Sequence, residues 1–532
     1  MAGVSGARYV LTYLRRIGAD RLFIVSGTDY AAFIEEKARG GDLPEFVVVP
    51  HEITAASAAV GYALAGRTGA VAVHTIPGTM NALGIIADAY SMRLPLFVIA
   101  GRSPYTERGS TASRDLRIHW TQEARDQGGI VRQWVKLDLE IRDASQLPDA
   151  MARAYQFAMS EPRGPVYLMI PREVSVQEVR EERYPVSDAF EPGPTSEALS
   201  RAQKAIEESE SPVIVTWRAG RRRSWYQSLK SFADRVGIPV LNYYGEFVNY
   251  RGEMALDWLD LKQADLLIAV ECEVPFIPRR TEFRGRLMRV DVDPLYSYIP
   301  YMGFGCDLCV QSSVSELFDR LNVREKGELK ARVREMHAEQ ERRKMEEVES
   351  MKKRRRIHPR LLSYYVGRLG LPVINEYPLA PEYTGLDWGM YFSDPGFGHL
   401  GWALGAAFGF SLAAGKRSVA AVGDGAFIFG VPEAFYYAAR TYGTDVTVVI
   451  FDNGGWMASA EAVESVFPNG AARARRTFPG ADFRRYDIGA TVRAFGGYYR
   501  LIERPEQIEE ALSEAVKHRG ISVVQAVVER AR

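Results

Sequence analysis

The sequence has 532 residues, of which 47% are hydrophobic and 25% are charged. This composition is typical of a globular protein with about three domains. Sixty-seven basic residues balance 67 acidic ones, so no overall field attracts nucleic acid or an anionic membrane. No apolar run approaches the roughly 18 residues of a membrane-spanning helix, and no targeting segment precedes the first amphipathic stretch. We therefore expect neither nucleic acid nor membrane as a partner.

The three cysteines are Cys272, Cys306 and Cys309. They are too few for the disulfide framework of a secreted protein, and the single CxxC formed by Cys306 and Cys309 lacks the second ligand pair that zinc requires. A reducing, cytoplasmic location therefore fits best. The role of Cys306 and Cys309 is left open.

The first third of the chain alternates short apolar runs with helical stretches. The predicted strands are 21–25, 45–49, 70–74, 94–100 and 166–170. This alternation predicts a parallel α/β sheet that is covered on both faces. After Pro171 the chain becomes rich in Glu, Arg and Pro, which is typical of a connecting segment. We place the first domain at residues 1–178.

A second α/β block carries predicted strands at 212–217, 266–270 and 287–292. It defines a central domain at residues 195–323. The following stretch, 324–357, is dominated by Glu, Lys and Arg and ends in the basic run 352–356. A solvated charged helix is the favoured interpretation of this linker over a specific anion site.

The third block carries predicted strands at 372–375, 418–422, 446–451 and 522–527. It forms a C-terminal domain at residues 358–532. The predicted fold class is therefore α/β, with three doubly wound parallel-sheet domains.

Two polar loops follow neighbouring predicted strands of the third domain. Gly423-Asp424-Gly425-Ala426 comes directly after the strand 418–422, and the next strand ends in the loop 452–456. Open α/β sheets bind ligands at the carboxyl ends of their strands, where free backbone N–H groups suit phosphate oxygens. Asp424 and Asn453 add the oxygen ligands that Mg²⁺ prefers. A tight turn is the alternative interpretation of the glycines.

These loops resemble the diphosphate and magnesium signature of thiamine-diphosphate-dependent enzymes, with Asp452 in place of the first of two usual asparagines. The resemblance implies thiamine diphosphate and Mg²⁺ as cofactors. It assigns the metal to Asp424, Asn453 and the backbone carbonyl of Gly455. The cofactor-binding set that it implies in these loops is Gly423, Gly425, Ala426 and Trp456.

The chain from 14 to 27 and the loop from 74 to 81 are similar to the acetolactate synthase and benzoylformate decarboxylase group of that family. Within this group Leu400, between Gly398 and Gly401, matches the aliphatic residue that bends the cofactor. Asn375 and Glu376 match a loop near the cofactor. The resemblance also implies that the cofactor lies between the first domain of one subunit and the third domain of its partner, so a homodimer is the minimal unit and a homotetramer is common.

Glu52 follows the apolar run 47–49 and precedes the small-residue helix 55–63. It matches the glutamate that, in this family, tautomerises the cofactor's aminopyrimidine ring. A helix N-terminal Glu that only complements the helix dipole is the alternative.

Three further residues match substrate-side positions of the group. His74 stands where benzoylformate decarboxylase carries an active-site histidine able to relay protons near neutral pH, although a strand-end histidine bonded to backbone is the alternative. Gln122 matches a glutamine that reaches the active site across the dimer interface, with a solvated loop as the alternative. Thr28 falls at a serine position that could hold a substrate carboxylate.

The implied function is that of an enzyme, a thiamine-diphosphate-dependent carbon–carbon lyase or transferase. An acetolactate-synthase-like 2-oxo acid decarboxylase and carboligase is the first hypothesis. The alternatives are a benzoylformate-decarboxylase-like enzyme, a 2-hydroxyacyl-CoA lyase and an inactive cofactor-binding protein. For the acyl-CoA alternative, the arginines at 473, 475, 476, 484 and 485 either face a CoA phosphate or form plain surface. FAD stays possible, because the central domain has no glycine-rich fingerprint but relatives hold flavin there without one.

Overall fold

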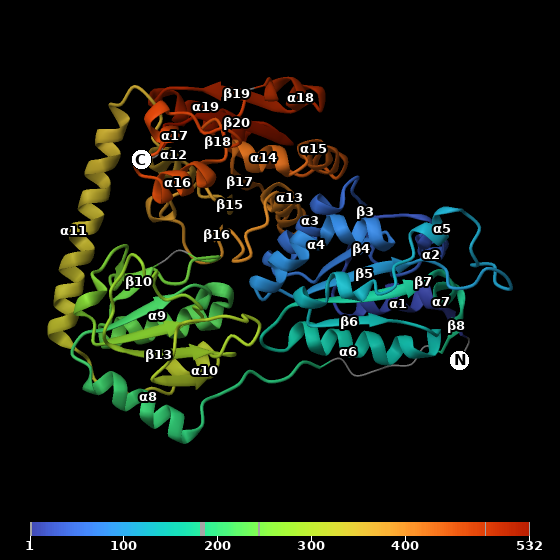
Figure 1. Ribbon diagram of the computed structural model, residues 1–532, viewed down its shortest axis with the longest axis horizontal. Coiled ribbons are helices and arrows are strands. Elements are labelled where there is room, and N and C mark those ends of the chain that lie inside the picture. Colours follow the sequence, from blue (N-terminus) through green and yellow to red (C-terminus); the bar gives the residue numbers. More distant parts are fainter. Residues whose placement is uncertain (1–2, 181–186, 243–244, 485, 531–532) are drawn as a thin grey trace.

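The computed structural model describes residues 3–180, 187–242, 245–484 and 486–530. It contains three parallel sheets of six strands, each flanked by helices, and these form three α/β domains in chain order (Figure 1). The predicted fold class is confirmed. A short antiparallel pair, β1 (Val4–Ser5) with β8 (Glu178–Val179), ties the two ends of the first domain together.

The first sheet has the strand order β3-β2-β4-β5-β7-β6. Its strands are β2 (Arg21–Val25), β3 (Glu45–Val48), β4 (Gly69–Val73), β5 (Leu96–Arg102), β6 (Leu137–Glu140) and β7 (Pro165–Pro171). Helices α3 (Glu52–Leu64) and α4 (Thr75–Ser91) contribute to the core on one face, and α1 (Gly6–Arg16), α2 (Ala31–Arg39) and α6 (Leu147–Met159) to the core on the other. The short helices α5 (Ile118–Thr121) and α7 (Arg172–Val176) lie in connecting segments.

The central sheet has the order β11-β10-β9-β12-β13-β14. Its strands are β9 (Pro212–Thr216), β10 (Val240–Asn242), β11 (Ala255–Leu256), β12 (Leu266–Val270), β13 (Arg286–Asp291) and β14 (Leu308–Gln311), and its helices are α8 (Ser196–Glu208), α9 (Arg223–Val236) and α10 (Val314–Phe318). The long helix α11 (Gly327–Lys352) runs from this domain to the third, on the left of Figure 1.

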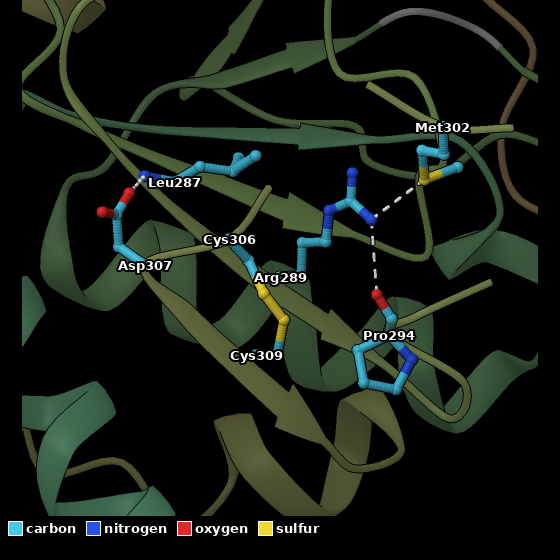
Figure 2. The surroundings of a disulfide bond; sticks show 7 residues. All are labelled: Leu287, Arg289, Pro294, Met302, Cys306, Asp307 and Cys309. Atoms are coloured by element: carbon cyan, nitrogen blue, oxygen red, sulfur yellow. Dashed lines mark hydrogen bonds between the residues drawn. A yellow bond between two sulfur atoms is a disulfide. The ribbon is translucent and has the colours of Figure 1, made fainter. Parts of the chain in front are cut away.

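The two cysteines whose role the sequence left open form a disulfide, Cys306–Cys309, at the start of β14. Figure 2 shows it beside Arg289, whose guanidinium donates to the Pro294 carbonyl over 3.4 Å. Asp307, between the two cysteines, accepts a hydrogen bond from the Leu287 amide at 2.7 Å. The CxxC segment thus closes a small loop against β13. Cys272 is buried and not paired.

The third sheet has the order β16-β15-β17-β18-β20-β19. Its strands are β15 (Val373–Glu376), β16 (Tyr391–Phe392), β17 (Ser418–Gly423), β18 (Val446–Asp452), β19 (Tyr498–Ile502) and β20 (Ile521–Val527). Its helices are α12 (Pro359–Gly367), α13 (Trp402–Ala414), α14 (Asp424–Phe429), α15 (Pro432–Thr441), α16 (Met457–Val466), α17 (Ala471–Arg475), α18 (Ile488–Ala494) and α19 (Ile508–Lys517).

The first and third sheets have the same strand order relative to the chain, and the central sheet has a different one, but all three share one feature. In each, the second strand along the chain lies on one side of the first, and a later strand lies on the other side. Ligands of open α/β sheets bind at such switch points, beyond the carboxyl ends of the strands. In the first and third domains these points fall at β2 and β4 and at β15 and β17.

Helices α3 and α13 join the first and third domains through small residues. A side chain on Gly61 would collide with the backbone of Ala406, and one on Gly409 would collide with the backbone of Ala58. The two helices therefore touch through their backbones, and one hydrophobic core runs through both domains. Among the described residues, no helix is both long enough and apolar enough to cross a bilayer.

Replacing Gly61 with Val should lower the free energy of unfolding by about 1–3 kcal/mol, because the new side chain must push the two helices apart. Chemical denaturation measures this change. Gly327→Val is the matched control, since nothing lies within 4 Å of a Cβ at Gly327. Equal stability of the two variants would show that the α3–α13 contact is not tight.

Candidate active site

A cavity of about 680 Å³ lies at the carboxyl ends of β15, β17 and β18. All but one of the residues predicted to bind the cofactor or the metal line it. They are Glu376, Gly398, Leu400, Gly423, Asp424, Gly425, Ala426, Asn453, Gly455 and Trp456. Sequence segments up to about 80 residues apart thus meet at one edge of a sheet, because the strands that carry them are parallel neighbours.

Asp424 and Asn453 carry buried oxygens that have no hydrogen-bond partner among the described residues. One Asp424 carboxylate oxygen accepts the Gly454 amide at 3.1 Å, whereas its Oδ1 and the side-chain oxygen of Asn453 are unpaired. Burial, together with the nearby carboxylate of Asp452, raises the pKa of Asp424 to about 6. Unpaired buried oxygens are costly, and a divalent cation would satisfy both.

The donor set suits Mg²⁺ rather than a metal held by protein alone. In the part of the chain that the structure describes, no three His, Cys, Asp or Glu side chains gather as a metal site. Mg²⁺ usually takes one or two protein oxygens and completes its shell with phosphate and water. Asp424, Asn453 and the Gly455 carbonyl therefore fit a magnesium ion that also binds a diphosphate.

The glycines of the first loop leave room for such a ligand. Nothing lies within 4 Å of a Cβ built on Gly423, which therefore faces open cavity space. A Cβ on Gly425, by contrast, would collide with the ring of Trp456. Gly425 thus allows the Trp456 ring to close one wall of the cavity.

The predicted pair Asn375 and Glu376 supports the cavity. The Glu376 carboxylate accepts the amides of Gly401 at 2.6 Å and Ala403 at 2.9 Å, so it holds the start of α13. Burial raises the pKa of Glu376 to about 8. Asn375 does not line the cavity and donates to the Ser393 hydroxyl at 2.9 Å. Both side chains are engaged by protein groups, and Leu400 lies in the loop that Glu376 fixes.

A second polar group lies at the switch point of the first sheet. His74 follows β4, and its Nδ1 lies 2.6 Å from an Asp29 carboxylate oxygen, while its Nε2 lies 3.2 Å from the Gln122 side-chain oxygen. Both partners can only accept at these atoms, so both contacts are hydrogen bonds only when the imidazole is protonated. The hydrogen bond to Asp29 is the main cause that raises the pKa of His74.

Asp29 was not identified from the sequence. It lies four residues after β2, is 3% exposed, and also accepts the Thr75 amide at 3.2 Å. Asp29 could have been identified from its position, because it follows the predicted strand β2, which is the neighbour of the strand that leads to His74. Thr28, beside it, pairs instead with His119 over 3.0 Å, and a Cβ on Gly27 would collide with the His74 ring.

Glu52 is the first residue of α3 and is 8% exposed. Its carboxylate accepts a hydrogen bond from Asn81 at 3.0 Å, and Gly78 leaves space beside its other oxygen. Glu52, His74 and Gln122 do not line the 680 Å³ cavity of the same chain. The structure thus contains two separate groups of predicted site residues, one in each outer domain.

The switch point of the central sheet is filled by paired charges. Arg218, after β9, lies 3.6 Å from Glu246 and also pairs with Glu273, while Arg93 of the first domain contacts Glu271 at 3.0 Å and Asp291 at 2.7 Å. These side chains form ion pairs with one another and fill the edge of the sheet, so the described residues there do not fit an open flavin crevice. The arginine at 485, considered for CoA, lies outside the described residues.

Asp29→Asn should lower the pKa of His74, because an amide replaces the carboxylate that favours the protonated ring. NMR titration of the histidine ring protons measures it. Asp42→Asn, which removes an exposed carboxylate paired with Arg15, is the control and should leave the pKa of His74 unchanged. An unaltered titration in Asp29→Asn would remove Asp29 from this role.

Comparisons with known proteins agree with this geometry. The thiamine pyrophosphate enzyme N-terminal TPP binding domain matches residues 4–130, and the corresponding C-terminal TPP binding domain matches residues 382–526. The probable 2-ketoarginine decarboxylase of Pseudomonas aeruginosa is 28% identical over 55% of the chain, which spans about half (53%) of that protein. The sulfoacetaldehyde acetyltransferase of Castellaniella defragrans is 24% identical, with 94% of this chain and 88% of that protein covered.

Solved structures show the same fold over the whole chain. The benzoylformate decarboxylase of Polynucleobacter necessarius superposes with a TM-score of 0.80 at 19% identity and covers 99% of both chains. Acetolactate synthase of Bacillus subtilis is 23% identical over 98% of this chain and 93% of its own length. With both cofactor-binding domains matched and the fold shared throughout, the chain belongs to the thiamine pyrophosphate enzyme family.

Proposed function

We propose that this protein is a thiamine-diphosphate- and Mg²⁺-dependent enzyme that decarboxylates a 2-oxo acid and transfers the remaining fragment to a second carbonyl, as an acetolactate-synthase-like carboligase. The observation that carries the proposal is the cavity at β15, β17 and β18, where the buried oxygens of Asp424 and Asn453 are unpaired. When bound, thiamine diphosphate supplies a carbon nucleophile and an electron sink beside the substrate carbonyl. We also propose a cytoplasmic location.

In this proposal the third domain holds the cofactor. Asp424, Asn453 and the Gly455 carbonyl bind Mg²⁺, which neutralises diphosphate charge. Gly423 allows the diphosphate to approach the backbone. Leu400 lines the cavity at the end of β15 and limits the shape that a bound cofactor can take.

The first domain of a second copy of the chain completes the site. Within one chain the Leu400 loop touches the far part of α4, because the His399 amide donates to Asp88 over 3.0 Å. His74 lies 14 residues earlier, at the start of α4, and 1.5 Å per residue places it about 20 Å away. A homodimer that brings Glu52 and His74 of one copy to the cavity of the other removes this separation. A homotetramer would be a pair of such dimers.

Glu52 and His74 move protons in this dimer. The Glu52 carboxyl exchanges a proton with the aminopyrimidine ring, and Asn81 fixes its orientation. The protonated His74 ring is held by Asp29 at Nδ1, and its Nε2 turns from Gln122 to bind the substrate carboxylate or to deliver the proton that replaces it. Because this second role ends in a free aldehyde, His74 favours a benzoylformate-decarboxylase-like reaction as the second candidate.

Glu52→Gln should lower the rate of CO₂ release at least ~10²-fold, because the amide cannot exchange the proton. The measurement uses 2-oxo acids from pyruvate to benzoylformate with thiamine diphosphate and Mg²⁺, and the products are identified as aldehyde or 2-hydroxy ketone. Glu45→Gln, an exposed change on β3, is the control and should keep full activity. Equal rates in both variants would remove Glu52 from the mechanism. If none of the 2-oxo acids releases CO₂, the result would point to acyl-CoA thioesters as substrates. If thioesters also fail to react, the result would point to an inactive cofactor-binding protein.

Asp424→Asn should abolish most of the thermal stabilisation that thiamine diphosphate and Mg²⁺ give the wild type. At a ligand concentration of 100 Kd that stabilisation is about 2.7 kcal/mol. Differential scanning calorimetry with and without both ligands measures it. Asp319→Asn removes an exposed carboxylate of the central domain and should keep the whole effect. A full effect in Asp424→Asn would place the metal elsewhere.

A further inference from the structure

A second cavity, of about 1000 Å³, lies beside the candidate active site, where β18, β19 and β20 end. It shares the lining residues Asn453, Val528 and Glu529 with the first cavity. Its basic lining residues come from four separate stretches of the chain. They are Arg354, Arg355, Arg356, Arg476, Arg504 and Arg530. Only two carboxylates, Glu503 and Glu529, face these six guanidinium groups in the lining.

The fold holds the basic stretch 354–356 in this place. Helix α11 ends at Lys352, and the arginines follow its end. Ile357, directly after them, is fully buried and forms a bridge with Val528, just beyond β20. The Glu529 amide also donates to the Ile357 carbonyl over 2.8 Å. The backbone of the basic run is therefore anchored at a sheet edge. Its side chains are exposed, as the favoured interpretation of a solvated linker expects.

Half of the positive charge in this cavity is not neutralised. Arg354 pairs with Glu529 at 2.9 Å, and Arg504 lies 3.3 Å from Glu506. In the described ranges, the side chains of Arg355, Arg356 and Arg476 make no hydrogen bond or ion pair. Like charges that share a cavity repel one another, so an anion that bridges them is stabilised there.

Arg530 connects the cavity to the predicted metal loop. Its guanidinium donates to the carbonyls of Asn453 at 3.0 Å and Gly454 at 3.2 Å, and it pairs with Asp482 at 2.7 Å. An anion bound beside Arg530 would therefore lie against the outer side of the loop that follows β18.

We propose that this arginine cavity binds a small molecule that carries a phosphoanhydride, such as a nucleoside diphosphate. Guanidinium groups bind phosphate oxygens through paired N–H donors, and three free ones match two adjacent phosphates better than one carboxylate. The volume is at the upper end of the range for small-molecule sites, which leaves room for a nucleoside. A free nucleotide and the nucleotide portion of a coenzyme thioester share this chemistry.

The test measures binding of ADP by isothermal titration calorimetry. The protein is first loaded with thiamine diphosphate and Mg²⁺, and the excess is removed, so that the cofactor site is not available. Cofactor released during the titration is quantified, which separates displacement from binding at the arginine cavity. Because no turnover is needed, this result does not depend on the proposed function.

The triple variant Arg355→Gln/Arg356→Gln/Arg476→Gln should weaken ADP binding about tenfold or more, since three charge-assisted contacts are lost. Arg279→Gln/Arg280→Gln/Arg332→Gln removes the same charge from exposed positions outside the cavity and should bind ADP like the wild type. Tighter binding of coenzyme A than of ADP would identify the nucleotide portion of a thioester as the ligand. Tighter binding of ADP would identify a free nucleotide.

Three results would overturn the proposal. The first is absence of ADP binding to the wild type, and the second is equal binding in the two triple variants. The third is equal affinity for sulfate at matched ionic strength, which would show a general basic surface rather than a phosphoanhydride site.

Discussion

Parallel strand direction is the constraint on which the rest of this molecule depends. In each domain all six strands of the sheet end at the same edge, and the crossover of the topology opens that edge. The three edges are used differently. The third holds unpaired oxygens at a cavity, the first holds the protonatable group around His74, and the central one holds charges that neutralise each other.

At the strand ends of the central sheet, the same geometry serves the packing of two domains instead of a ligand site. Arg93 reaches from the first domain to Glu271 and Asp291, where all three side chains are almost fully buried. Arg93 and Glu271 both have positive φ, at 54° and 47°, a conformation that costs energy for residues other than glycine. A buried ion pair is weak evidence of net stability, so its effect is better seen as fixing how the first and central domains are placed.

The sequence predicted the long apolar strands of every sheet and the edge strand β3, but not the edge strands β6, β11, β14, β16 and β19 or the inner strand β10. β2, β4, β5, β7 and their counterparts are buried on both faces, so they appear as continuous apolar runs. Edge strands such as β6 and β19 contain charged or half-exposed residues and give no such signal. β10 and β11 were missed because they are only three and two residues long.

Site residues in short loops could be predicted from the sequence when the loop comes directly after a strand that is recognisable as an apolar run. Asp424 and Asn453 each lie two residues beyond an apolar run, whereas Asp29 lies four residues beyond one and its contact to His74 depends on side-chain direction. An anion site was an alternative for the basic run 352–356 and for the arginines at 473–485 separately, but their meeting in one cavity was not predicted, because Arg355 and Arg476 are about 120 residues apart. The contacts of Arg354 and Ile357 with Val528 and Glu529, which the sequence does not reveal, place the end of the linker at the same edge.

The loop that carries Leu400 is positioned by all three domains through buried carboxyl groups. Backbone amides of this segment donate to Glu376 of the third domain, Glu246 of the central domain and Asp88 of the first, at 2.6, 2.9 and 3.0 Å. Burial raises the pKa of Glu376 to about 8 and that of Glu246 to about 7, and it raises the pKa of Asp88 well above its usual range. A carboxyl that keeps its proton near neutral pH can still accept an amide hydrogen, without the cost of a buried charge. The wall of the cavity is thus held by contacts that all three domains supply.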